Sequence, residues 1–377
     1  MIVYLGMFLI ASCFAFFSEY ELRRTLPDLR QYTVTAKFKR SRILFWLAAI
    51  PYFIIAALRY RVGTDYLTYI QIQIPQLLQG NDARLKFEYL YQFVIKIGMS
   101  LGGTQVVFAL THLIFLFFIW KAVQFFSTDY VISLFIFMFG CYYNLSLNIM
   151  RQSIAMAIFL MATVYIVRSS PVKYVVTVIG AMLFHKTAII YLPMYLLSKI
   201  KVRERMAICT VIVLGVLASP IRKVLVWLTD ITGVYASYFN SRYDVLDRQW
   251  DLILFNLFIL LMYAYLHHFF SKATPGWVYE HTLISKVNEE RFNNLFFNLQ
   301  VIATAFAGLS SVIPNSTRII MMFSLGQIIY VPYLIQKIRD VALRRWFLLV
   351  FIFCYVGIFI RLIIMKNLGE TLPYQFI

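Results

Sequence analysis

Long apolar runs separated by short polar segments dominate the chain. Most of these runs have roughly 15–22 residues, the length that crosses a bilayer as an α-helix. Charged residues are confined to the segments between the runs. The pattern predicts an all-α polytopic membrane protein with about 10 full transmembrane helices. After a first run within residues 1–17, the predicted spans are 43–58, 104–120, 130–146, 152–167, 206–219, 251–266, 292–313, 319–335 and 346–365.

One apolar segment is too irregular for a simple span. In residues 173–199, "KYVVTVIGAMLFHKTAIIYLPMYLLSK", two apolar stretches flank His185 and Lys186. Each stretch has only about 11 residues, which is too short to cross a hydrocarbon core of ~30 Å. We therefore expect a pair of short half-helices whose tip, at His185, reaches a recessed cavity within the membrane zone. With the spans, this gives about 12 helical segments in a single integral-membrane domain over residues 1–377.

Basic residues orient this predicted bundle. Residues 19–42 form a short segment with seven Lys and Arg residues, which the positive-inside rule places in the cytoplasm. Basic residues after alternate spans agree with this register, including those of the loop 267–291. The polar segments 59–103 and 220–250 then lie on the periplasmic face. The N-terminus and the C-terminus are both expected to be periplasmic.

Composition supports the membrane class and narrows the partners. The chain is 61% hydrophobic and 14% charged, whereas soluble domains carry about 25% charged residues. A net charge of +18 would suggest nucleic-acid binding in a soluble protein, but cytoplasmic loops account for it here, so no nucleic-acid partner is expected. No metal-binding motif occurs, and the four cysteines lie inside apolar runs. Any enzyme encoded here is expected to need no metal or cofactor.

Several charged residues fall at the predicted outer edge of the bundle. Arg151 and Arg318 occupy the first turns of inward-running spans, and His185 precedes the second half-helix. Helix N-termini attract anions, and the arginine fork matches a phosphate. Arg59 and Arg61 end an outward-running span in "ALRYRVGTDYLTY", residues 57–69. Together they suggest an outward-facing site for a membrane-embedded anion.

Each candidate also has a structural interpretation. Snorkelling would account for Arg59 or Arg61, and Asp65 could serve only as their ion-pair partner. Glu88 could simply begin an amphipathic surface helix, "FEYLYQFVIKIG", residues 87–98. His185 is harder to explain in this way, because ionisable residues within the membrane zone are functional by default.

Six stretches of the chain stand out together: "RYRVGTDYLTY" (59–69), "FEYLYQFVIKIG" (87–98), "NIMRQSIAMAIFLMA" (148–162), "MLFHKTAIIYLP" (182–193), "TRIIMMFS" (317–324) and "LPYQFI" (372–377). They resemble the signature blocks of the EpsG family, which groups with the Wzy-type polymerases of bacterial O-antigen, capsule and exopolysaccharide. The blocks follow the family's order and are spread over nearly the whole chain. The second block departs from the usual pattern, because Tyr89 follows Glu88 where the family usually has Gly or Pro.

The resemblance implies a GT-C-like glycosyltransferase of the bacterial inner membrane. Such a polymerase transfers a growing glycan from one undecaprenyl diphosphate to a lipid-linked repeat unit at the periplasmic face. The lipid-linked oligosaccharides, donor and acceptor, are the expected partners, and a chain-length regulator in the same membrane is a further candidate. Binding of the diphosphate or glycan is assigned to Arg59, Arg61, Arg151, Arg318 and Glu88.

The acceptor hydroxyl also needs a general base. His185 suits this role by the intrinsic pKa of histidine, ~6.5, and Asp65 is the alternative.

Two other classes would also need cations at membrane depth. A flippase of lipid-linked oligosaccharides should show paired halves and a path open to both faces, but the sequence has no internal repeat. Another membrane transferase, such as an O-antigen ligase or an acyltransferase, is the remaining alternative.

Overall fold

The computed structural model describes residues 1–25, 33–80, 88–232, 239, 248–270 and 286–376. Over these residues the chain is all-helical, with 80% of residues in helices and no strand. Parts of the four predicted polar segments, 19–42, 59–103, 220–250 and 267–291, fall outside the described residues, as does Phe87. The all-α prediction is confirmed.

Six helices of the described chain are long and apolar enough to cross a membrane. Two bent helix pairs raise this number to eight if each pair is one span. The six are α1 (Ile2–Thr25), α2 (Thr33–Leu47) with α3 (Ala49–Ala57), α8 (Thr104–Phe126), α11 (Met150–Val167), α16 (Trp250–Phe270) and α20 (Val341–Phe359) with η4 (Ile360–Met365). The bent pairs are α14 (Glu204–Val216) with α15 (Ala218–Thr232), at 70°, and α18 (Ser316–Ser324) with α19 (Gln327–Gln336), at 42°.

The predicted number of about ten full spans is therefore not confirmed. The segment 130–146 is broken into α9 (Tyr130–Phe139) and α10 (Tyr142–Ser146), because Cys141 adopts a left-handed φ of 64°. Residues 292–308 of the segment 292–313 lie in α17 (Lys286–Gly308), which is too polar to be counted as a span, and the last five residues lie beyond the helix end. Asn298 and Gln300 of α17 are buried, so its polar residues face protein.

The predicted pair of short helices is confirmed. α12 (Pro171–Met182) and a second short apolar segment, made of η3 (Lys186–Tyr191) and α13 (Met194–Leu197), flank His185. The predicted helix at 87–98 is also present as α7 (Tyr89–Leu101), with Glu88 at its N-cap. One side of α7 is buried through Tyr91, so the helix is part of the core as well as amphipathic. The remaining short elements are α4 (Tyr66–Thr68), η2 (Tyr69–Gln73) and α5 (Ile74–Leu78).

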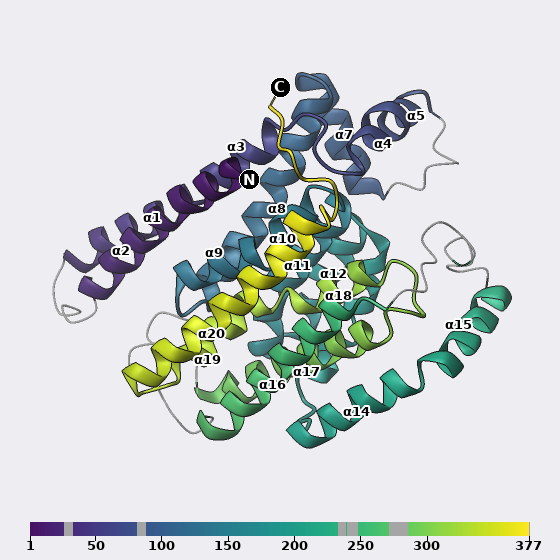
Figure 1. The fold of residues 1–377 in the computed structure, drawn as a ribbon. Coiled ribbons are helices and arrows are strands. Elements are labelled where there is room, and N and C mark those ends of the chain that lie inside the picture. Colours follow the sequence, from purple (N-terminus) through teal and green to yellow (C-terminus); the bar gives the residue numbers. More distant parts are fainter. Residues whose placement is uncertain (26–32, 81–87, 233–238, 240–247, 271–285, 377) are drawn as a thin grey trace.

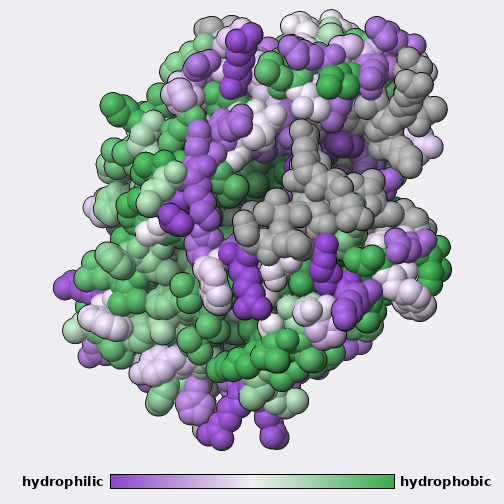
Figure 2. Space-filling model, turned by 45° about the vertical axis from the view of Figure 1, so that its right-hand side comes forward, coloured by the Kyte–Doolittle hydropathy of each residue, from purple (hydrophilic) through white to green (hydrophobic). Residues whose placement is uncertain are grey.

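Helix α11 forms the centre of the bundle, with 83% of its 18 residues buried. It packs between α8 and α12, and small residues such as Ala155 and Ala157 allow the close approach. The ring of Phe159 stacks on Tyr191 of η3 at 3.8 Å, which fixes the second half-helix against the centre. Outside this core, hydrophobic side chains form a broad band on the left of Figure 2, between hydrophilic residues at the top and the bottom. That surface suits contact with lipid.

The two ends of the chain meet at one end of the molecule (Figure 1). The hydroxyl of Tyr4 donates to the carbonyl of Thr371 at 3.0 Å. The C-terminal segment 367–376, here called the C-terminal strap, runs beside residues 59–64. Backbone bonds join Tyr60 N to Gln375 O at 2.9 Å and Thr64 N to Gly369 O at 3.0 Å. The strap therefore connects the last and the first thirds of the chain next to the site described below.

Candidate functional site

A polar cavity of about 690 Å³ lies where several distant segments converge. Its wall combines the loop after α3, η2, the N-termini of α11 and α18, the junction of the half-helices, and the C-terminal strap. Four of the predicted site residues line it: Asp65, Arg151, His185 and Arg318. The other lining residues are Thr64, Thr68, Tyr69, Gln73, Leu145, Asn148, Ile149, Gln152, Asn315, Thr317, Leu368, Gly369 and Glu370.

The carboxylate of Glu88 joins two of these groups from behind the wall. Arg151 Nη1 donates to Glu88 Oε2 at 2.8 Å, and His185 Nδ1 lies 3.1 Å from Glu88 Oε1. The backbone N–H of Lys186 donates to the same Oε1 at 3.0 Å. The Glu88 side chain is only 8% exposed, against 19% for Arg151 and 20% for His185. Glu88 thus holds the arginine and the imidazole in place while these two side chains reach the cavity.

Glu88 is ionised at neutral pH. Burial alone would raise its pKa, but the hydrogen bond from His185 and the charge of Arg151 outweigh burial and lower the pKa to about 2. The ordinary pKa of a glutamate side chain is about 4.3. The lowered pKa of Glu88 therefore stabilises the fold above about pH 4, and this stabilisation is lost only as the pH falls toward 2. A carboxylate can only accept hydrogen bonds. His185 Nδ1 must therefore carry the proton, and in the neutral ring Nε2 is left with a lone pair.

A second ion pair lies on the same wall. Arg318, in the first turn of α18, has Nη2 at 3.7 Å from Asp65 Oδ2, and both side chains are about one-third exposed. The predicted position of Arg318 is confirmed, and Asn315 occupies the N-cap without a side-chain capping bond. Thr317 Oγ1 donates to Gln249 Oε1 at 2.8 Å, which links this rim to the start of α16.

Arg59 lies outside the cavity lining, although the sequence assigned it to the same pool as Arg151. Its side chain is completely buried, and Nη1 donates to the carbonyl of Leu147. Nη2 contacts Met150 Sδ at 3.0 Å, and the guanidinium lies 4.9 Å from the ring centre of Phe108. These contacts fix the turn that precedes α11. In the structure, Arg59 therefore supports the fold beneath the site and does not line the cavity.

Arg61 also lies outside the lining. It adopts a left-handed φ of 50°, its side chain is exposed, and its guanidinium lies 5.5 Å from the ring centre of Tyr60. Of the five residues assigned to substrate binding, only Arg151 and Arg318 line the cavity directly.

Two glycines let the strap and the loop after α3 approach Asn148. Gly63 and Gly369 have φ values of +106° and +78°, which side chains rarely adopt, and a Cβ at either position would collide with the Asn148 side chain. Asn148 is 4% exposed, and its Oδ1 accepts from Thr64 Oγ1 at 3.0 Å. The close approach closes the floor of the cavity beside the N-terminus of α11.

Sequence reasoning missed several polar residues of the wall. Tyr69 accepts a hydrogen bond from Arg151 Nε at 3.3 Å, and Asn148, Gln152 and Glu370 also line the cavity. The available signal was position: Tyr69, Asn148 and Gln152 lie in the same sequence blocks as Asp65 and Arg151. Nothing comparable pointed to Glu370, whose place depends on how the strap folds back.

A comparison with known protein families gives a match over nearly the whole chain. The model of the EpsG family matches residues 42–376. This range includes each residue of the cavity wall. No curated protein and no solved structure matches the chain.

Proposed function

Because the chain belongs to the EpsG family of Wzy-like polysaccharide polymerases, we propose that it elongates a lipid-linked glycan at the cavity described above. The growing glycan leaves one undecaprenyl diphosphate and joins a lipid-linked repeat unit. We place the cavity at the periplasmic face of the inner membrane, because the basic composition of segment 19–42 favours the cytoplasm and Arg23 of this segment lies at the opposite end of α1 from Tyr4, which contacts the strap beside the cavity.

The observation that carries the proposal is the contact of Glu88 with both Arg151 and His185. One carboxylate positions a cation that can bind phosphate and an imidazole that can accept a proton. The arrangement resembles other enzyme sites in which a buried carboxylate fixes the tautomer of a histidine base. We therefore assign Glu88 a positioning role in place of direct substrate binding.

The proposed reaction is a single displacement at the anomeric carbon of the donor. The acceptor hydroxyl forms the new C–O bond, and its proton passes to His185 Nε2. The bond between the anomeric carbon and the diphosphate oxygen breaks, and the diphosphate leaves with the electron pair. Glu88 stabilises the imidazolium that forms, as a carboxylate next to a histidine base does elsewhere.

Two arginines then stabilise the charge on the leaving diphosphate. Arg151 and Arg318 lie at the N-termini of α11 and α18, where backbone N–H groups also favour an anion. In this proposal they supply the positive charge that a metal ion supplies in some other transferases. Arg59 supports them indirectly by holding the turn before α11.

The function is tested with the purified protein and a purified lipid-linked repeat unit in detergent. We expect a ladder of products that differ by one repeat unit, because polymerisation needs no separate compartments. A flippase would leave the substrate unchanged under these conditions, and a ligase would need a different acceptor. Absence of any ladder from folded protein supplied with the repeat unit would contradict the proposal.

A groove suited to the lipid part of the substrate reaches the start of α16, where Gln249 bonds to the cavity residue Thr317. It lies between α16 and α20, has a volume of about 660 Å³ and is lined mainly by apolar residues such as Phe255, Phe258 and Phe353. At its outer end, Asp251 pairs with Arg361 at 3.5 Å and with Lys366. The chain continues from there into the strap residues that line the cavity. We propose that the isoprenoid chain lies in this groove.

Gly357 offers a test of the groove, because it lines the groove and no atom lies within 4 Å of the position of an added Cβ. We expect Gly357→Trp to raise KM for the lipid-linked substrate about 10-fold by filling the space, while kcat and thermal stability stay close to the wild type. Gly357→Ala is the matched control. Equal KM values in steady-state assays of the two variants would rule out this place for the lipid chain.

A further inference from the structure

A second polar pocket lies at the opposite end of the bundle from the candidate active site. It has a volume of about 530 Å³ and is lined by residues of α1, α9, α19 and α20. Tyr4 of α1 contacts the strap beside the cavity, whereas Arg23 of the same helix lines this pocket. At 1.5 Å per residue, the two positions are about 28 Å apart along the helix. Arg344 and Arg345, which follow the span predicted at 319–335, lie at this end.

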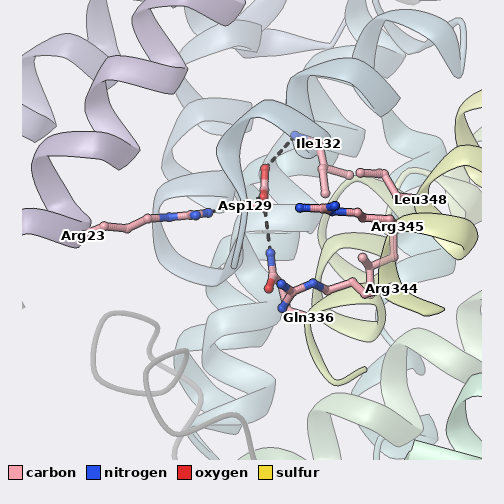
Figure 3. A pocket seen from close by; sticks show the side chains of 8 residues that line it. Arg23, Asp129, Ile132, Gln336, Arg344, Arg345 and Leu348 are labelled. Carbon is pink, nitrogen blue, oxygen red and sulfur yellow. Dashed lines mark hydrogen bonds and ion pairs between the residues drawn. The ribbon is translucent and has the colours of Figure 1, made fainter. Parts of the chain in front are cut away.

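Three arginines converge on the pocket from two helices. Figure 3 shows Arg23 entering from α1 on one side and Arg345 from α20 on the other, both directed toward Asp129. Arg344, also from α20, extends toward Gln336. Proteins often bind a phosphate group with several arginine guanidinium groups, as in the arrangement of these three side chains around the pocket.

The two acidic residues beside the pocket, Asp129 and Glu19, already bond to other groups of the protein. Asp129 caps α9, since its Oδ1 accepts from Ile132 N at 2.9 Å and its Oδ2 accepts from Gln336 Nε2 at 3.3 Å. Glu19 accepts from the backbone N–H groups of Tyr130 and Val131 at the same helix end. Both carboxylates also pair with a single arginine, Arg23, at 3.4 and 3.8 Å.

Arg344 and Arg345 differ from Arg23 in this respect. Neither makes an ion pair within the part of the chain that the structure describes. The pocket therefore holds three positive charges, and the acidic groups beside it balance only part of them. An anion would complete the site.

We propose that this pocket binds the phosphate headgroup of an anionic membrane lipid. The pocket opens at the ends of two candidate spans, and its wall includes the apolar side chains of Ile132, Ile335 and Leu348, against which the glycerol and first acyl carbons can rest. Trp346, 58% exposed on α20, marks the depth of the membrane interface, where headgroups lie. Basic pockets between transmembrane helices on the cytoplasmic side are known to take such headgroups. The site is independent of the proposed polymerase chemistry.

The proposal is tested by native mass spectrometry of the full-length protein in detergent, titrated with phosphatidylglycerol. We expect Arg344→Gln/Arg345→Gln to bind this lipid about 30-fold more weakly, since each arginine near an anionic surface contributes about 5-fold. The control is Lys201→Gln/Arg339→Gln, which removes two exposed charges at the same end outside the pocket and should bind as the wild type does. Phosphatidylcholine, with no net charge, should bind weakly to all three proteins.

Two outcomes would overturn the site. Equal phosphatidylglycerol affinity of the pocket variant and the control variant would show that the pocket does not bind the headgroup. Displacement of the lipid by inorganic phosphate at a comparable concentration would assign the pocket to a soluble phosphate compound instead. Arg344→Lys/Arg345→Lys keeps the charges and should retain partial binding, so a folding defect of the glutamine variant would not hide the result.

Discussion

Replacement of His185 by alanine is expected to abolish ladder formation, with kcat reduced about 10³-fold or more. A positioned general base typically contributes 10²–10⁴-fold, and His185 is the imidazole on the cavity wall whose Nδ1 is held by Glu88. Among the described residues, Nε2 has no hydrogen-bond partner, so it is available to the acceptor hydroxyl. Binding of the lipid-linked repeat unit should persist, since Arg151 and Arg318 are unchanged. Steady-state kinetics and a binding assay with the same substrate separate the two effects.

A matched control is available in the same chain. His267 also faces a glutamate, with its Nδ1 at 3.0 Å from Glu204 Oε1, but it lies on α16 away from the cavity. His267→Ala should leave ladder length unchanged. His185→Gln distinguishes a base from a neutral hydrogen-bond donor, because glutamine can donate but cannot accept the proton. Full-length ladders from His185→Gln would remove His185 from the mechanism and favour Asp65, the other candidate base on the wall.

Loss of the Glu88 carboxylate is expected to have the second largest effect. Glu88→Gln should lower kcat about 10²-fold with a smaller change in KM, because the amide cannot accept from Arg151, His185 and Lys186 N–H together. Glu88→Asp keeps the charge and should recover part of the rate. The control is Glu204→Gln, which alters the pair of Glu204 with His267 and should leave kcat and KM unchanged.

The pH profile tests whether Glu88 acts through His185. In the wild type, Glu88 has a pKa of about 2, so it stays charged across the range in which the protein would be assayed. Loss of activity on mild acidification would then not come from protonation of the Glu88 carboxylate. In Glu88→Gln the imidazolium loses its neighbouring charge, and the acid limb of the profile should move to lower pH. An unchanged acid limb, with reduced expression or thermal stability, would mean that Glu88 only supports the fold.

The sequence alone predicted the all-helical class and the six helices that are long and apolar enough to cross a membrane. The apolar runs at 104–120 and 152–167 correspond to α8 and α11, and the two short stretches around His185 correspond to α12 and η3 with α13. These features are readable because the length and hydropathy of a run depend on the local chain and on the thickness of the bilayer. For the same reason, Arg151 and Arg318 were correctly placed at helix N-termini.

Only the tertiary structure decided which of the candidate residues meet. Glu88 contacts residues 63 and 97 positions away along the chain, and no local pattern encodes such a pairing. Arg59 and Arg151 are the same residue type and both lie at the predicted outer edge of a span, yet one is enclosed by Phe108 and Leu147 and the other lines the cavity. The span predicted at 292–313 was not confirmed, and the buried Asn298 and Gln300 of α17 face other helices, a packing that hydropathy along the chain does not record. The chemistry of this site depends on the packing of distant helices, which hydropathy and motif spacing do not specify.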